Sequence, residues 1–170
     1  MRRGEKRVGG MKKVVVLQGP PTCGKTLTLK SALRVLTEKK AKVKAQYRWR
    51  GEMPVLDVWA VLDVCGKNVF FSTADGASIK IEEQFAEALE CAELKKEQID
   101  VFVFPVRETG RGKRLLNNVV AKIGTKNALI LQKRTAVLGK EQIEKNEADA
   151  QDTAAAVIAA ASDGVSCERV

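Results

Sequence analysis

The sequence predicts an α/β fold: a three-layer sandwich around a mainly parallel sheet, with one antiparallel strand contributed by a hairpin. Two observations carry this prediction. Short apolar runs rich in Val, Leu and Phe alternate along the chain with longer segments of helical periodicity. Two of the runs are separated only by a short Cys-Gly-Lys-Asn turn, which is typical of a hairpin. The 170 residues suffice for one domain with a substantial core and are too few for two.

The predicted strands are short apolar runs, bounded by polar residues or glycine. They cover residues 14–17, 55–64, 69–75, 101–106 and 127–135. The fourth of them is apolar throughout, as expected of a strand buried on both faces of the sheet. Residues 42–50 alternate loosely and are strongly basic, which fits either a short strand or a loop on the substrate side.

The predicted helices show apolar residues at helical spacing between the strands. They cover residues 25–39, 79–96, 114–123 and 141–161. In the second of them Ile81, Phe85, Ala88 and Leu89 fall on one face, with acidic residues between them. Because the helices alternate with the strands, we expect them to cover both faces of the sheet.

The segment between the first strand and the first helix matches G-x-x-x-x-G-K-[ST] at every fixed position. Gly19 and Gly24 allow the backbone to turn so that its N–H groups can surround a phosphate. Lys25 brings a positive charge to the terminal phosphates, and the Thr26 hydroxyl can bind Mg²⁺. The following helix points its N-terminal dipole at the same anion. The alternative is a glycine-rich turn without a ligand, which the flanking strand and helix disfavour.

We therefore predict a nucleotide site in this loop. Its predicted binding residues are Gly19, Pro20, Pro21, Thr22, Cys23, Gly24, Lys25, Thr26 and Leu27.

Two aspartates follow apolar strands and are candidates to support the metal, Asp63 and Asp75. If the second hairpin strand runs parallel to the first strand of the chain, Asp75 lies at the carboxyl edge near Thr26, and Asp63 lies at the opposite edge. The hairpin also returns Asp57 to within reach of Asp75, and Glu52 precedes it. We predict Thr26 and Asp75 as metal ligands, and Asp57 or Glu52 as a base or a second metal contact. The alternative for each is a surface carboxylate or an Asx turn.

Residues 107–114 combine four cations with two glycines, directly after a buried strand. We predict a mobile clamp that binds phosphoryl oxygens during transfer, because guanidinium groups offer forked donors on a flexible backbone. Arg107 and Arg111 thus join Lys25, Asp57 and Asp75 in the predicted catalytic set. The alternative is a solvated loop before a helix. Lys133 and Arg134 end the last strand at the same edge, without a supporting motif.

Composition narrows the chemistry. The formal net charge is +9, which fits a protein that binds phosphates or nucleic acid. The chain has no histidine, so a general base must be a carboxylate or be supplied by the substrate. The cysteines are scattered, with no C-x-x-C pair, which argues against a zinc site and a disulfide framework. Residues 1–10 read as a flexible basic extension before a single domain over residues 11–170.

The amino terminus lacks the apolar stretch of a secretory signal, and no apolar run approaches the length of a membrane span. We therefore expect a cytoplasmic protein without a membrane contact.

With these residues the chain resembles the P-loop NTPase superfamily, and within it the small kinase-like members. Residues 72–76 and 107–110 are similar to segments of small, uncharacterised bacterial and phage ATP-binding proteins. The resemblance implies a P-loop NTPase fold that binds ATP with Mg²⁺. The sequence lacks the D-x-x-G and N-K-x-D patterns of GTPases. It also has Gly76, and not Glu, after Asp75, unlike AAA-type motor ATPases.

The favoured function is therefore phosphoryl transfer to a small acceptor, whose identity the sequence does not indicate. The alternative function is a nucleotide-dependent switch or weak ATPase that acts on a protein or nucleic-acid partner. The basic residues 42–50, which include two aromatic residues, would suit nucleic acid.

Overall fold

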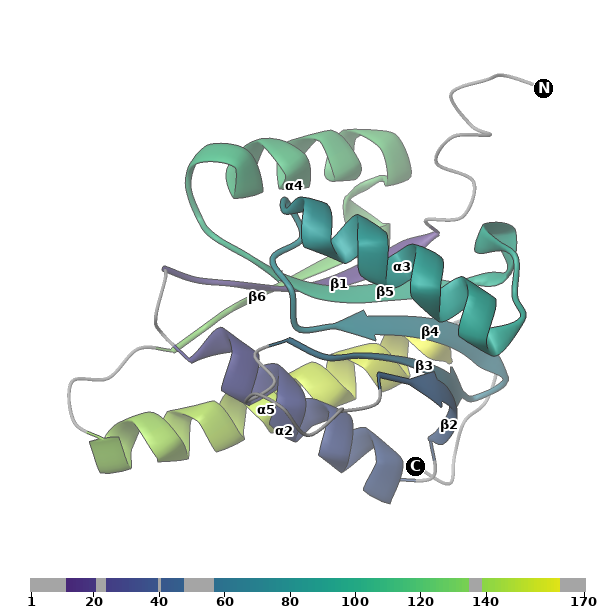
Figure 1. Cartoon of the computed structure of the whole chain (residues 1–170). Helices are drawn as coiled ribbons and strands as arrows, with labels where there is room; N and C mark the ends of the chain where they lie inside the picture. Colours follow the sequence, from purple (N-terminus) through teal and green to yellow (C-terminus); the bar gives the residue numbers. More distant parts are fainter. Residues whose placement is uncertain (1–11, 21–23, 40, 48–56, 135–138, 163–170) are drawn as a thin grey trace.

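The computed structural model describes residues 12–20, 24–39, 41–47, 57–134 and 139–162. Within these ranges the chain forms a six-stranded sheet with helices on both faces (Figure 1). The strands are β1 (Lys13–Gln18), β2 (Lys42–Gln46), β3 (Trp59–Val64), β4 (Lys67–Ser72), β5 (Val101–Val106) and β6 (Ala128–Gln132). The helices are α2 (Lys25–Glu38), α3 (Ile79–Ala92), α4 (Gly110–Ile123) and α5 (Gly139–Ala161), with short 3₁₀ turns η1 (Lys96–Gln98) and η2 (Thr125–Asn127).

The strand order across the sheet is β2-β3-β4-β5-β1-β6. The pairs β4–β5, β5–β1 and β1–β6 are parallel, whereas β3 is antiparallel to both β2 and β4. Within the described residues, β3 is thus the one strand that opposes the other five. The prediction of a mainly parallel sheet with one antiparallel hairpin strand is confirmed. Within the basic segment that could have been a strand or a loop, residues 42–46 form edge strand β2.

The β3–β4 hairpin turns at two residues, Cys65 and Gly66, whose φ values are +53° and +82°. Two successive positive φ values are the requirement of a type I′ turn, the connection that matches the twist of paired strands. The Asp63 carboxylate accepts a hydrogen bond from the Gly66 N–H at 2.9 Å and stabilises the turn. Asp63 pairs with Asn68 at the start of β4, so it lies at the amino edge of the parallel strands, as predicted.

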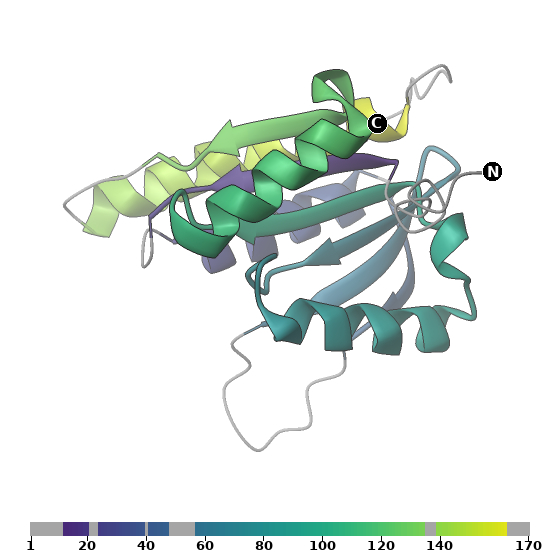
Figure 2. The same ribbon diagram turned by 90° about the horizontal axis from the view of Figure 1, so that it is seen from above.

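The two faces of the sheet carry separate cores. α2 and α5 cover one face, and α3 and α4 cover the other (Figures 1 and 2). Side chains of β1 point alternately to the two faces and so contribute to both cores. Val15 and Leu17 pack under α2 and α5, while Val14 and Val16 pack on the opposite face. This arrangement is the predicted three-layer sandwich.

The helix boundaries differ most from the sequence prediction at the end of α3 and at the start of α4. α3 ends at Ala92 because Glu93 takes a left-handed φ of +56° and the Leu94 N–H bonds the Leu89 carbonyl, a C-terminal capping pattern. α4 begins at Gly110, whereas the sequence predicted a start at residue 114. Strand β3 begins at Trp59, after Asp57 and Val58, and β6 ends at Gln132, before Lys133 and Arg134.

The early start of α4 corrects the prediction of a loop over residues 107–114. A Cβ on Gly112 would lie 2.4 Å from the backbone oxygen of Arg107. The absence of a side chain therefore lets the first turn of α4 pack against the preceding chain. Residues 107–109 alone connect β5 to α4, and Gly112 serves close packing where the sequence indicated backbone mobility.

The two cysteines among the described residues differ in state. Cys65 is disulfide-bonded, whereas Cys91 has a free, exposed thiol. The sequence predicted no disulfide framework, and the disulfide of Cys65 was not anticipated. Among the described helices, none combines the length and the apolar character that crossing a membrane requires.

We predict that replacing Gly112 by alanine lowers the free energy of unfolding by about 1–3 kcal/mol, because the added Cβ is overpacked against the backbone. Alanine normally stabilises a helix relative to glycine by about 1 kcal/mol, so the sign of the effect is diagnostic. Lys113→Ala, at an exposed position of the same turn, is the control. Urea unfolding monitored by circular dichroism measures both, and a Gly112→Ala variant as stable as the control would contradict the packing argument.

Candidate functional site

The loop after β1 begins between two neighbouring strand ends. The Gly19 N–H donates to the Val106 carbonyl at 3.2 Å, and the Gln18 carbonyl accepts from the Lys133 N–H at 2.7 Å. β5 and β6 therefore hold the chain from both sides where it leaves the sheet. Because β1 is an interior strand between β5 and β6, the loop opens between two neighbouring strand ends at the carboxyl edge. In parallel sheets this edge is where ligands bind.

Gly24 occupies a position that only glycine fits well. Its φ of 93° and ψ of 18° lie in the left-handed region. A Cβ there would also lie 2.8 Å from the side-chain oxygen of Asn146 on α5. Asn146 is itself held by Gln142, whose amide donates to it at 2.8 Å. The Gly24 carbonyl then accepts from the Thr28 N–H at 2.9 Å, which closes the first turn of α2.

Lys25 folds back over the start of the loop. Its ammonium group donates to the carbonyls of Gly19 at 2.8 Å and Pro20 at 2.7 Å. These bonds keep a partly buried positive charge beside the N-terminus of α2, where the helix dipole adds to its attraction for anions. An anion at this point would meet a cation already in place.

A cavity of about 420 Å³ opens beside this loop. Its lining residues come from four separate segments of the chain. They are Gly24, Lys25, Thr26, Leu27, Asp57, Asp75, Pro105 and Arg107. The structure thus brings together four of the five predicted catalytic residues with both predicted metal ligands. Arg111 is the exception, since it lines a different cavity between α3 and α4.

Asp57 is positioned by the end of β4. One carboxylate oxygen accepts from the Thr73 hydroxyl at 3.2 Å, and the other lies 3.4 Å from the Lys80 ammonium. The Thr73 hydroxyl in turn accepts from the Val58 N–H at 2.9 Å. The Thr73 hydroxyl and the Lys80 ammonium group therefore orient the Asp57 carboxylate. The Asp57 side chain is 22% exposed and lines the cavity.

Asp75 has two roles in the structure. One oxygen accepts from the Ala77 N–H at 2.8 Å, the Asx bond that sequence analysis left open as an alternative. The other oxygen lies 3.9 Å from Nε of Arg107, and the carboxylate is 37% exposed. Asp75 therefore shapes the turn before α3 and still presents one oxygen beside Arg107 at the cavity.

The donor set of the cavity suits a phosphate with Mg²⁺. Thr26, Asp57 and Asp75 provide hard oxygen ligands, and Lys25 and Arg107 provide cations for phosphate oxygens. No three carboxylates or cysteines among the described residues cluster closely enough to bind a metal ion by themselves. Mg²⁺ is commonly bound by one or two protein ligands together with water and substrate phosphates, which this arrangement allows.

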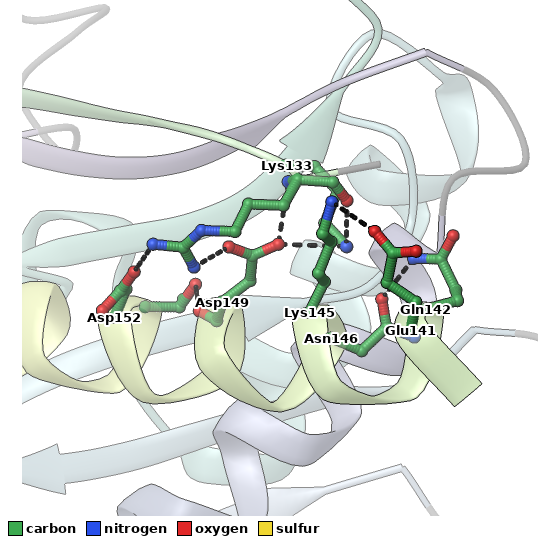
Figure 3. A network of polar contacts seen from close by, with 9 residues as sticks. Lys133, Glu141, Gln142, Lys145, Asn146, Asp149 and Asp152 are labelled. Carbon is green, nitrogen blue, oxygen red and sulfur yellow. Dashed lines mark hydrogen bonds and ion pairs between the residues drawn. The ribbon is translucent and has the colours of Figure 1, made fainter. Parts of the chain in front are cut away.

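An ion-pair network beneath the loop was missed by sequence analysis. The Lys133 ammonium is fully buried and lies 3.0 Å from a carboxylate oxygen of Asp149 on α5 (Figure 3). Arg134 pairs with Asp149 and, at 3.0 Å, with Asp152. These contacts bind β6 to α5, the helix that also carries Asn146 against Gly24. No local pattern marked Asp149, because its helix alone does not show which residue faces a strand end.

Lys133 and Arg134 thus bind α5, and their contacts are within the protein. The hydrogen bond with Asp152 and the charge of Asp149 raise the pKa of Arg134 above its ordinary value. Because the pKa of Arg134 is higher in the folded than in the unfolded protein, its charge stabilises the fold at every pH below the pKa of the unfolded state. This stabilisation is lost only in strong alkali.

Some predicted residues lie outside the described part of the chain. These are Pro21, Thr22, Cys23 and Glu52, the basic extension at residues 1–10, and residues 48–50 of the basic segment.

Comparison with known proteins found no match to any protein-family model, curated protein or solved structure. The motif and the geometry around it therefore define the candidate site.

We predict that Asp149→Asn lowers the free energy of unfolding by about 3–5 kcal/mol, because it leaves the Lys133 ammonium buried without a counter-charge. The matched control is Asp152→Asn, which removes a partner of Arg134 but has a 53% exposed side chain, and should cost less than about 1 kcal/mol. Urea unfolding at neutral pH compares the two. Equal losses of unfolding free energy in the two variants would show that the buried pair of Lys133 and Asp149 contributes no more to stability than the exposed pair.

Proposed function

We propose that this protein binds Mg·ATP in the cavity beside Lys25 and transfers the terminal phosphoryl group to a small acceptor. The observation that supports this best is the joint lining of one cavity by Lys25, Thr26, Asp57, Asp75 and Arg107. A glycine-rich turn without a ligand would give no reason for carboxylates and a guanidinium group from three other segments to gather there.

Binding of the phosphates would fall to the loop and to Lys25. The ammonium group would exchange its bonds with the carbonyls of Gly19 and Pro20 for bonds with phosphate oxygens, without leaving the cavity. The left-handed turn at Gly24 starts α2 directly beside them, so the N–H groups at the start of this helix would face the same anion.

The Thr26 hydroxyl and the Asp75 carboxylate are the residues that would hold Mg²⁺. Bound there, the ion would neutralise charge on the phosphate oxygens and orient them for transfer. Arg107, beside Asp75, can follow charge as it develops on the transferred group. Asp57 can accept the proton of a hydroxyl acceptor or serve as a second contact near the metal, since no histidine is present.

We predict that Lys25→Ala weakens ATP binding by about 10²-fold, equivalent to a loss of roughly 3 kcal/mol. The cause is removal of the positive charge that contacts the terminal phosphates. Arg34→Ala, on an exposed face of the same helix, is the control and should bind ATP like the unaltered protein. Isothermal titration calorimetry with Mg·ATP measures the affinity, and thermal unfolding checks that each variant is folded. Unchanged affinity in Lys25→Ala would overturn the assignment of the site.

We predict that Arg107→Ala lowers turnover by about 10²-fold with little change in ATP affinity, because its contacts strengthen toward the transition state. Lys113→Ala lies close in sequence but lines neither cavity, and it should leave turnover unchanged. ADP production with and without added acceptors also separates the two functions. Acceptor-dependent production supports transfer, whereas ATP-dependent binding of a protein or oligonucleotide without an acceptor effect would favour the switch.

A further inference from the structure

A second cavity, of about 630 Å³, lies between α3 and α4 on the face of the sheet opposite α2. Both helices cover the same face but over different strands: α3 packs on β2, β3 and β4, and α4 packs on β5 and β6 (Figure 2). The cavity lies where neither helix covers β4 and β5 fully. Its size is within the range of pockets that bind small organic molecules.

The floor of this cavity is aromatic. Phe70, Phe102 and Phe104 come from β4 and β5, and Phe85 comes from α3. The ring of Phe85 lies 5.0 Å from that of Phe70 and 5.3 Å from that of Phe102, between ring centroids. Tilted rings at these separations form a stable apolar surface on which a further planar ring can pack.

The rim of the cavity is cationic. Arg111 and Arg114 lie one turn apart on α4, and Lys96 follows α3, whereas Glu82 is the one acid among the lining residues. Within the described part of the chain, neither arginine takes part in an ion pair. Two guanidinium groups beside an aromatic floor are the donors expected for a phosphate attached to a ring.

A closely packed wall separates this cavity from the one beside Lys25. The Gly76 N–H donates to the Pro105 carbonyl at 2.8 Å. Asp75 and Pro105 line the Lys25 cavity, while their chain neighbours Gly76 and Phe104 line the aromatic one. A Cβ on Gly76 would lie 2.3 Å from the Phe104 ring, so the wall has no room for a side chain.

We propose that the cavity between α3 and α4 is a second ligand site, and that its ligand is an aromatic molecule carrying a phosphate group, of about the size of a nucleoside monophosphate. Its ring packs on the phenylalanines, and its phosphate lies at Arg111 and Arg114. The packed wall keeps this ligand apart from the cavity beside Lys25, so this site does not depend on the proposed function.

The test is calorimetric titration with AMP and 1-naphthyl phosphate, in a Lys25→Ala background that weakens binding at the other cavity. Adenosine and ribose 5-phosphate serve as the separate halves of the ligand. We expect both aromatic phosphates to bind, and each half to bind at least 10-fold more weakly, because the ring and the charge contact different walls.

Two variants place the ligand in the cavity. Arg114→Gln removes one cation, and Ala77→Trp fills the space from a lining position; each should weaken binding of AMP and 1-naphthyl phosphate at least 10-fold. Lys113→Gln is the matched control on the same turn of α4 and should bind normally. Thermal unfolding confirms that each variant is folded.

Absence of binding by both aromatic phosphates, or binding that neither variant weakens, would overturn the proposal. ATP titrations of the same proteins with Lys25 intact keep the two hypotheses separate. Normal ATP binding without aromatic phosphate binding contradicts the second ligand site alone. Failure of ATP to bind, with aromatic phosphate binding that Ala77→Trp abolishes, contradicts the proposed nucleotide site and supports the ligand of the second cavity.

Discussion

The candidate site depends on the parallel pairing of β4, β5 and β1 in adjoining positions of the sheet. Parallel strands end at the same edge, so the residues that follow them converge even though they are far apart in sequence. Lys25 follows β1, Asp75 follows β4, and Arg107 follows β5. Reversal of β3 brings Asp57 to the same edge, because the chain enters that strand where β4 ends. An antiparallel β4 would have sent Asp75 to the opposite edge.

Helix α5 supports this edge from beneath. Asn146 leaves no room for a side chain at residue 24, and the buried pair of Asp149 with Lys133 binds α5 to the end of β6. The same strand end bonds the residue before the loop. A buried ion pair is weak evidence for stability, since desolvation offsets most of its attraction. Its more specific effect is on position, because it aligns the helix whose Asn146, about one turn before Asp149, limits the loop.

The two cavities share a wall formed by the end of β5 and the start of the turn before α3. A backbone hydrogen bond and the close packing of Gly76 against Phe104 close this wall, so it separates the contents of the two cavities. Arg107 lines one cavity and Arg111 lines the other, although sequence analysis had placed them in one clamp.

The sequence by itself determined the layer order, the strand–loop–helix motif around Lys25 and the edge on which Asp75 and Asp63 lie, because these follow from periodicity and from a hairpin that local turn residues specify. Only the tertiary structure decided that α4 begins at Gly110 and that Asp149 pairs with Lys133. Both depend on contacts between segments that are packed in space, such as Gly112 against the backbone of Arg107, and a local pattern carries no information about which distant group a residue will meet.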